Sequence, residues 1–180
     1  MARRQNPAPG KVIASIIYSS LDALADAVTV LEKKFGRVVC ETLDIPCCDQ
    51  KTYREEMGED LIRRFVSFDR EIDRSALFDL KSYTYKVEQQ FSDMVDDFMF
   101  RTVNIDPGII TPANIVIASH HDSNYKIYLK DGVFSEIALI YGRGRYLRLP
   151  WTNEDYCSEE AISFFERVRD TFEILEPVGK

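Results

Sequence analysis

Short apolar runs alternate with amphipathic segments through the first half of the chain. Their periods differ, because a strand repeats every two residues and a helix every three or four. In chain order they predict a strand at 11–19, a helix at 20–35, a strand at 37–45, a polar connection at 46–61, a strand at 62–72, a helix at 73–91 and a strand at 101–105. This order of strands and helices is that of a ferredoxin-like split βαβ unit.

The helix at 20–35 has the clearest end signals. Ser20 is a residue type that favours the N-cap, because its hydroxyl can accept a bond from a free backbone N–H. Lys33 and Lys34 fall in the last turn, and Gly36 lies just beyond it, as is typical of helix C-termini. We therefore expect this helix to begin and end close to these residues.

The second half of the chain is richer in strands. Asp131-Gly132 is a strong signal for a two-residue hairpin turn, and the glycines of Gly142-Arg143-Gly144 indicate a second tight turn. Strands are predicted at 113–119, 125–129, 133–141 and 145–150, and a helix within 151–172. The sequence therefore predicts an α+β fold, with a ferredoxin-like first part extended by antiparallel β-hairpins and a C-terminal helix.

Length and composition fit one domain. A chain of 180 residues that is 45% hydrophobic can build one sizeable core. Residues 1–10 are rich in Pro, Arg and small side chains, which predicts a flexible lead-in to a single domain at 11–176.

The charge balance and the apolar runs exclude some classes of protein. Thirty acidic against 23 basic residues give a net charge of −7, and no basic stripe of the kind that binds nucleic acid is visible. No run approaches the roughly 18 apolar residues of a membrane helix, and no signal peptide is apparent. We therefore expect a cytoplasmic protein whose four cysteines are reduced.

Common catalytic and nucleotide-binding motifs are absent. Gly10-Lys11 is followed by Val12, and the phosphate-loop pattern G-x-x-x-x-G-K-[ST] does not occur. The chain also lacks G-x-G-x-x-G after a strand, G-x-S-x-G and H-E-x-x-H. No cofactor is therefore identified from the motifs.

The stretch 101–106 combines a strand pattern with polar side chains. Asn104 lies inside the strand, where asparagine is disfavoured, so a polar partner should meet it. Asp106-Pro107-Gly108 predicts a turn after the strand, because aspartate caps, proline fixes φ and glycine permits a positive φ.

That turn would make 101–106 and 113–120 antiparallel neighbours. Asp106 and His120 would then lie about 20 Å apart, at opposite ends of the pair. Adjacent histidines in a strand point to opposite faces, so at most one should reach a given site. Four basic side chains would share one end of the pair, as a cluster suited to a phosphate or carboxylate: Arg101, His120, His121 and Lys126.

Glu136 stands within the apolar run 133–141. A two-residue turn at Asp131-Gly132 sets it opposite Ile127, where a partly buried carboxylate would have a raised pKa suited to acid–base work. A three-residue turn, from Lys130 to Gly132, sets it opposite Lys126, in a cross-strand ion pair.

Several separate motifs in a shared order give the chain a resemblance. YREEMGEDLIRRFVSF, RTVNIDPGIIT, YKIYLKDGVFSEIALIY and LPWTNEDY together resemble the bacterial domain of unknown function 4416 family, with a departure at SHHDSNYK. The resemblance implies a compact, soluble bacterial or archaeal protein and supplies no reaction. Relatives sometimes carry a GTP-binding label, which the missing phosphate loop does not support.

Three functions follow as hypotheses. The first is binding of a small anionic or nucleotide-like ligand, by an enzyme or a binding protein. In it Glu136 or Glu56 would act as acid and base, and the ligand would be held by Arg101, Lys81, Asn104, Asp106, Lys126 and His120. The second is a non-catalytic interaction or assembly domain. The third is a metal-dependent hydrolase using His120 or His121 with Asp106 and Asp122, which a count of two histidines disfavours. A cleft that gathers the polar residues favours the first, and scatter over a convex surface favours the second.

Overall fold

The computed structural model describes residues 5–96 and 98–172 of the chain. Its first half contains β1 (Gly10–Tyr18), α1 (Leu21–Phe35), β2 (Val38–Glu41), β3 (Ile45–Pro46), α2 (Gln50–Met57), β4 (Ile62–Ile72) and α3 (Leu77–Gln90). The second half contains β5 (Ser92–Val95), β6 (Phe98–Arg101), β7 (Val103–Ile110), β8 (Asn114–Ser119), β9 (Ile127–Lys130), β10 (Val133–Gly142), β11 (Arg145–Arg148) and α4 (Glu159–Asp170). Short 3₁₀ turns at Arg74–Ala76 and Glu154–Cys157 precede α3 and α4.

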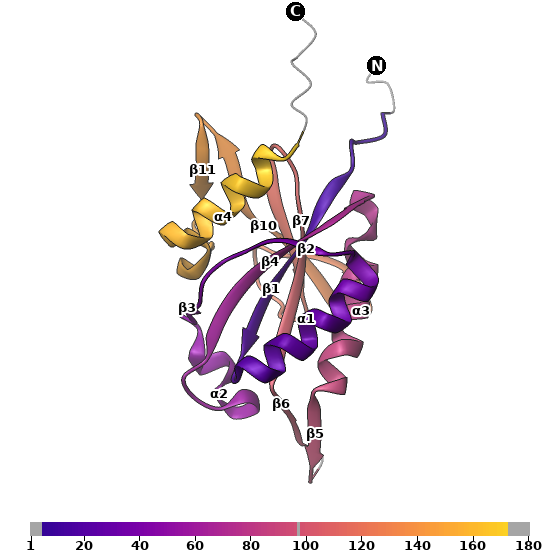
Figure 1. The fold of residues 1–180 in the computed structure, drawn as a ribbon, viewed down its shortest axis with the longest axis vertical. Coiled ribbons are helices and arrows are strands. Elements are labelled where there is room, and N and C mark those ends of the chain that lie inside the picture. Colours follow the sequence, from indigo (N-terminus) through magenta and orange to yellow (C-terminus); the bar gives the residue numbers. More distant parts are fainter. Residues whose placement is uncertain (1–4, 97, 173–180) are drawn as a thin grey trace, which may run out of the picture.

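Nine of these strands form one antiparallel sheet (Figure 1). Its path runs β11-β10-β8-β7-β1-β4-β2, with β3 beside β4 and β9 beside β10. Within the described residues, four α-helices accompany this sheet. The predicted α+β class is therefore confirmed. The strand order of the whole sheet does not establish the ferredoxin-like topology, which stays a prediction.

The strongest local signals of the sequence correspond to elements of the structure. The hydroxyl of Ser20 accepts a hydrogen bond from the N–H of Ala23 at 3.2 Å, and Gly36 ends α1 with a φ of 89°. β4 has the predicted bounds. Asp131 and Gly132, both with positive φ, form the turn between β9 and β10.

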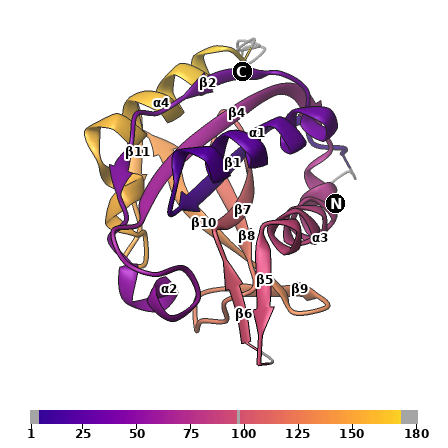
Figure 2. The ribbon, with the colours of Figure 1, turned by 60° about the horizontal axis from the view of Figure 1, so that its bottom comes forward.

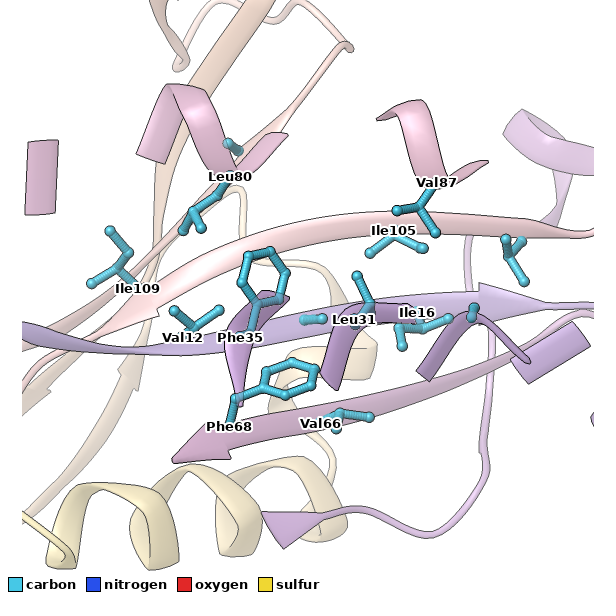
Figure 3. Packing of buried hydrophobic residues seen from close by; sticks show 14 of the residues in the cluster. Val12, Ile16, Leu31, Phe35, Val66, Phe68, Leu80, Val87, Ile105 and Ile109 are labelled. Atoms are coloured by element: carbon cyan, nitrogen blue, oxygen red, sulfur yellow. The ribbon is translucent and has the colours of Figure 1, made fainter. Parts of the chain in front are cut away.

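The sheet buries both of its faces. On one face, alternate β1 residues such as Val12 and Ile16 pack with Leu31 and Phe35 of α1 and with α3 (Figure 3). On the other face, Ile13 belongs to a second cluster that includes the phenylalanines of α4. In Figure 2, β4 passes between α1 and α4. Helices thus cover the sheet from opposite sides, which accounts for continuous apolar runs in the central strands.

β5 and β6 form a separate two-stranded hairpin that the hydrophobic pattern did not predict. It projects from the end of the molecule opposite the start of β1 and the end of α4 (Figure 1). Four of its apolar side chains are exposed: Met94, Val95, Phe98 and Phe100. The predicted strand at 101–105 is divided, because β6 ends at Arg101 and β7 begins at Val103.

The predicted turn at Asp106-Pro107-Gly108 is wrong. These residues lie in the middle of β7, where every residue is buried, and they pair with β1 from Ala14 opposite Pro107 to Ser15 opposite Asp106. The chain turns later, where the N–H of Thr111 bonds the carbonyl of Asn114 at 2.9 Å. The composition of this segment is typical of a turn, but its position between β1 and β8 makes it part of a strand.

Pro107 and Gly108 instead decide where β7 and β8 separate. Their pairing extends only from Gly108 opposite Ile117 to Ile110 opposite Ile115. Pro107 has no N–H to donate to a neighbouring strand, so the ladder cannot continue through it. At Gly108 the strands are so close that a Cβ would lie 2.8 Å from the carbonyl oxygen of Val116. β7 and β8 therefore touch at Gly108 and part at Pro107.

Of the predicted lead-in at 1–10, residues 1–4 lie outside the described residues, 5–9 belong to no helix or strand, and Gly10 begins β1. The assignment of 11–176 to one domain stays a prediction, and its last four residues lie outside the described part.

We expect Gly108→Ala to lower the free energy of unfolding by about 1–3 kcal/mol, as overpacking of a tight core does. The added methyl would meet the backbone of β8, which cannot move without breaking the ladder. Gly142→Ala is the matched control, because its Cβ would meet the Leu147 side chain at 3.4 Å. Urea unfolding of both variants measures the difference, and equal loss in the two would contradict the tight contact.

Candidate functional site

In the part of β7 that precedes Pro107, side chains of α3 take the place of β8 as hydrogen-bond partners. Lys81 Nζ donates to the carbonyl of Ile105 at 2.8 Å, and Thr84 Oγ1 donates to the same oxygen at 3.1 Å. The N–H of Ile105 donates to Glu88 Oε1 at 2.8 Å. Buried peptide groups need hydrogen-bond partners, so the part of β7 that does not pair with β8 requires polar residues on the inner face of a helix.

These helix residues form a closed ring of contacts with β6 and β7. Lys81 Nζ lies 2.9 Å from Glu88 Oε1 and 3.0 Å from Asp106 Oδ1. Arg101 Nη1 donates to Glu88 Oε2 at 2.9 Å and to Asn104 Oδ1 at 2.8 Å. Asn104 Nδ2 completes the ring by donating to Asp106 Oδ2 at 3.2 Å. We call Lys81, Glu88, Arg101, Asn104 and Asp106 the polar ring.

Asn104 is the one uncharged member of the polar ring, and it makes the two links that are not ion pairs. A side-chain amide accepts through its oxygen and donates through its nitrogen, which is what a position between a guanidinium and a carboxylate demands. The polar partner expected for this strand asparagine is therefore present twice, in Arg101 and Asp106.

Opposed charges keep Lys81 and Asp106 ionised despite their burial. Burial alone would lower the pKa of Lys81, but Asp106 and Glu88 raise it above its ordinary value. Burial likewise would raise the pKa of Asp106, and the Lys81 ammonium holds it below its usual range. The side chain of Lys81 is 1% exposed, so its charge depends on the two carboxylates beside it.

Two adjoining chambers open beside the polar ring, on the α4 side of the sheet. The Arg101 chamber, of about 210 Å³, is lined by Thr52, Tyr53, Glu56, Lys81, Arg101, Asn104, Asp106, Ser119, His120 and His121. The Glu136 chamber, of about 110 Å³, shares five of these residues, Thr52, Tyr53, Asp106, Ser119 and His121. It adds residues that include Arg63, Tyr125, Lys126, Glu136 and Tyr156. We call the two chambers together the cleft.

Glu136 and Lys126 face each other in the Glu136 chamber. Lys126 Nζ lies 3.4 Å from Glu136 Oε1 and donates to Ser119 Oγ at 2.7 Å. β9 and β10 pair with an irregularity at Val133 that sets Ser135 opposite Ile127, so Glu136 falls at the level of Lys126. Of the two registers considered, this is the ion pair. Burial nevertheless raises the pKa of Glu136, with Lys126 opposing the shift.

The expectation that at most one histidine reaches a given site is wrong. His120 and His121 both line the Arg101 chamber. β8 ends at Ser119, so the alternation of a strand does not extend to them. β7 and β8 are antiparallel neighbours as expected, but the register that separated Asp106 from His120 is wrong: Gly108 lies opposite Ile117, and Asp106 and His120 line the same chamber. Burial, reinforced by the Lys81 charge, lowers the pKa of His120, whose ring packs against Tyr85.

All eight residues of the ligand site predicted in the first hypothesis line the cleft. Glu56, Lys81, Arg101, Asn104, Asp106 and His120 border the Arg101 chamber, and Asp106, Lys126 and Glu136 border the Glu136 chamber. Their roles in binding or catalysis stay predictions. Arg101 lines one chamber with His120 and His121, but Glu88 and Glu56 lie beside its guanidinium, so these residues do not form the purely cationic cluster that was predicted.

Three residues that form buried ion pairs were not among the predicted site residues. Glu88 follows Lys81 by seven positions, two helical turns, and this spacing on a buried helix face was the available signal. Arg63 and Asp155 form a second buried ion pair, with Nε and Oδ2 2.7 Å apart. They are 92 positions apart in the chain, so no local pattern links them.

Among residues 5–96 and 98–172, no helix is long and apolar enough to cross a membrane. The same residues contain no group of three or more His, Cys, Asp or Glu side chains arranged to hold a metal ion.

One family model matches residues 8–172, almost the whole described chain. The chain belongs to the DUF4416 family. The family is a domain of unknown function, so membership assigns no reaction to the cleft. No curated protein and no solved structure matches the chain. The cleft of this DUF4416 domain must therefore be interpreted from its own geometry.

We expect Lys81→Met to lower the free energy of unfolding by about 3–5 kcal/mol, the cost of leaving buried charges unpaired. Glu88, Asp106 and the Ile105 carbonyl would all lose the ammonium. Lys86→Met, an exposed position on α3, is the matched control. Chemical unfolding measures both, and similar midpoints for the two variants would contradict the role of the polar ring.

Glu136 should make stability depend on pH in a defined direction. A carboxyl whose folded pKa lies above its unfolded value contributes most below the unfolded pKa, and this contribution is lost as pH rises through the raised pKa. Glu136→Gln does not titrate, so its unfolding free energy should increase relative to wild type as pH rises through that window. Urea unfolding across the window measures this, with exposed Glu55→Gln as control. A constant difference across the window would show that Glu136 keeps an ordinary pKa.

Proposed function

We propose that this DUF4416 domain binds a small molecule with an anionic group in the cleft, and that Glu136 exchanges a proton with it. The observation that carries the proposal is the convergence of eight polar residues on two adjoining chambers. They come from α2, α3, β6, β7, β10 and the segments that follow β8, which only the tertiary fold brings together. Concave sites with a few convergent polar groups are the usual form of small-molecule sites.

The basic side chains support an anionic group. Lys126 is an ammonium with three protons, of which one goes to Ser119 at 2.7 Å, while Glu136 lies at the longer distance of 3.4 Å. Arg101 borders the other chamber, where Asp106 and Glu88 already compensate Lys81. The anion would therefore be held by directed hydrogen bonds rather than by a large excess of positive charge.

The size of the cleft limits the ligand. Chambers of about 110 and 210 Å³ are smaller than the usual pockets for drug-sized molecules. A phosphate, a short carboxylic acid or a small phosphorylated metabolite fits this scale, and a polymer does not.

Glu136 has the surroundings of a general acid or base. Burial raises the pKa of its carboxyl toward the range in which one group can both release and accept a proton. Lys126 lies beside it and would stabilise negative charge that develops on a bound ligand. Proton transfer at a group held near Lys126 is the chemistry that this pair supports.

The only tryptophan of the chain provides a direct test. Trp151 stacks on Tyr125, which lines the Glu136 chamber, with ring centroids 5.4 Å apart and an interplanar angle of 8°. We expect its fluorescence to change saturably with inorganic phosphate, malonate or a nucleoside monophosphate. Lys126→Met should weaken that binding about tenfold or more, since a hydrogen bond to a charged group is worth roughly 1.5–3 kcal/mol.

Lys130→Met is the matched control, because Lys130 is exposed on β9 away from the cleft. Equal binding by the two variants would remove Lys126 from the site. No change in fluorescence or melting temperature with any of these ligands, in correctly folded protein, would contradict the proposal.

A non-catalytic interaction domain is the second candidate, and the hairpin of β5 and β6 is the observation that favours it. Three of its exposed apolar side chains, Val95, Phe98 and Phe100, share one face of the hairpin and form a projecting surface of the kind that often marks a protein contact. Absence of any ligand in the titration would favour this reading.

Two finer proposals concern the fold and the compartment. The order β7-β1-β4-β2, with antiparallel neighbours and the helices α1 and α3 between strands, supports a ferredoxin-like unit as the base of the cleft. A cytoplasmic location is proposed from the sequence alone.

A further inference from the structure

We infer that the carboxylate of Glu56 occupies the place of the ligand's anionic group on Arg101, and that the ligand displaces it together with α2. This inference rests on the proposed function, because it concerns the same cleft. It assigns Glu56 the part of an internal competitor, in place of the acid or base expected from the sequence.

The guanidinium of Arg101 has an inner and an outer side. On the inner side, Nη1 donates to Glu88 and Asn104, both buried. On the outer side, Nε lies 2.7 Å from Glu56 Oε2. Nε is nevertheless buried without an aligned acceptor among the described residues. The inner contacts therefore fix the guanidinium, and the outer one leaves a donor that a better-placed anion can use.

Exposure distinguishes the two carboxylates that flank Arg101. The Glu88 side chain is 1% exposed, whereas that of Glu56 is 37% exposed. Removing Glu88 from Arg101 would leave a buried charge, while Glu56 can exchange its partner for water. Glu56 is thus the partner that an incoming anion can replace, and Arg101 keeps a negative neighbour before and after the exchange.

Few buried side chains attach α2 to the rest of the protein, so it can move as one wall of the cleft. Of its eight residues, Met57 is the buried one, and Tyr53 packs partly against the same small cluster of Ile17, Cys47 and Leu61. The helix also supplies Thr52, Tyr53 and Glu56 to the cleft lining. An element with few buried apolar contacts opens at low free energy, so releasing Glu56 need not unfold the sheet.

Glu56→Gln tests the inference, with Glu55→Gln as the matched control. The two substitutions remove the same charge from neighbouring residues, but Glu55 is exposed and makes no ion pair among the described residues. Binding of inorganic phosphate and of malonate is measured for each by Trp151 fluorescence, so that a phosphate and a carboxylate are compared. We expect Glu56→Gln to bind the preferred anion about two- to fivefold more tightly than Glu55→Gln, the factor implied by an exposed ion pair.

Hydrogen exchange of α2 provides a second readout. In wild type, amides of 50–57 should exchange faster at a saturating concentration of the anion, and in Glu56→Gln they should exchange fast without it. Both results support the inference, and unchanged exchange of 50–57 in anion-saturated wild type contradicts it.

Other outcomes separate the two ideas. Equal tightening in both glutamine variants, or weaker binding by Glu56→Gln, overturns the inference and leaves the proposed function standing. Failure of wild type and both variants to bind either anion overturns both.

Discussion

The separation of β7 and β8 at Pro107 is the constraint on which the cleft depends. A proline cannot donate to the neighbouring strand, so the peptide group of Ile105 must find partners elsewhere. α3 supplies them with Lys81, Thr84 and Glu88, which explains why a helix that faces the core carries a lysine and a glutamate. Once these charges are buried, Arg101, Asn104 and Asp106 are needed to balance them. The polar ring beside the cleft is thus a consequence of the N–H group that Pro107 lacks.

Charge balance explains why this arrangement can be stable. The polar ring contains two basic and two acidic side chains, joined through one amide, so it has no net charge to bury. Such networks cost free energy when a partner is removed, because the remaining charge cannot reach water. Two further ion pairs lie at the border of the cleft: Glu56 with Arg101, and Lys126 with Glu136. The molecule therefore combines a fixed polar base with side chains that can exchange partners.

Local sequence patterns were enough to predict most of the helices, strands and turns. The candidate site could be recognised only from the arrangement of these elements in space. The caps of α1, the bounds of β4 and the turn at Asp131-Gly132 depend on nearby residues, and these predictions are confirmed. Asp106-Pro107-Gly108 has the composition of a turn, yet it lies inside β7, because its meaning depends on which strands flank it. The contact of Lys81 with Asp106 spans 25 positions, and that of Arg63 with Asp155 spans 92. The sequence marked the residues of the cleft as unusual, but it did not indicate that they line shared chambers.

The position of the β5–β6 hairpin has a consequence for how this fold can vary. The chain leaves α3 just after Glu88, and it returns through Arg101, so the ion pair between them closes the neck of the hairpin. Ser92 pairs with Arg101, and the N–H of Thr102 bonds the carbonyl of Phe91 at 3.0 Å. Because the neck is fixed this way, residues can be inserted or deleted between Val95 and Phe98 without changing the path of the chain through the cleft. The hairpin is therefore the part of the molecule where length can diverge among relatives while the polar ring stays the same.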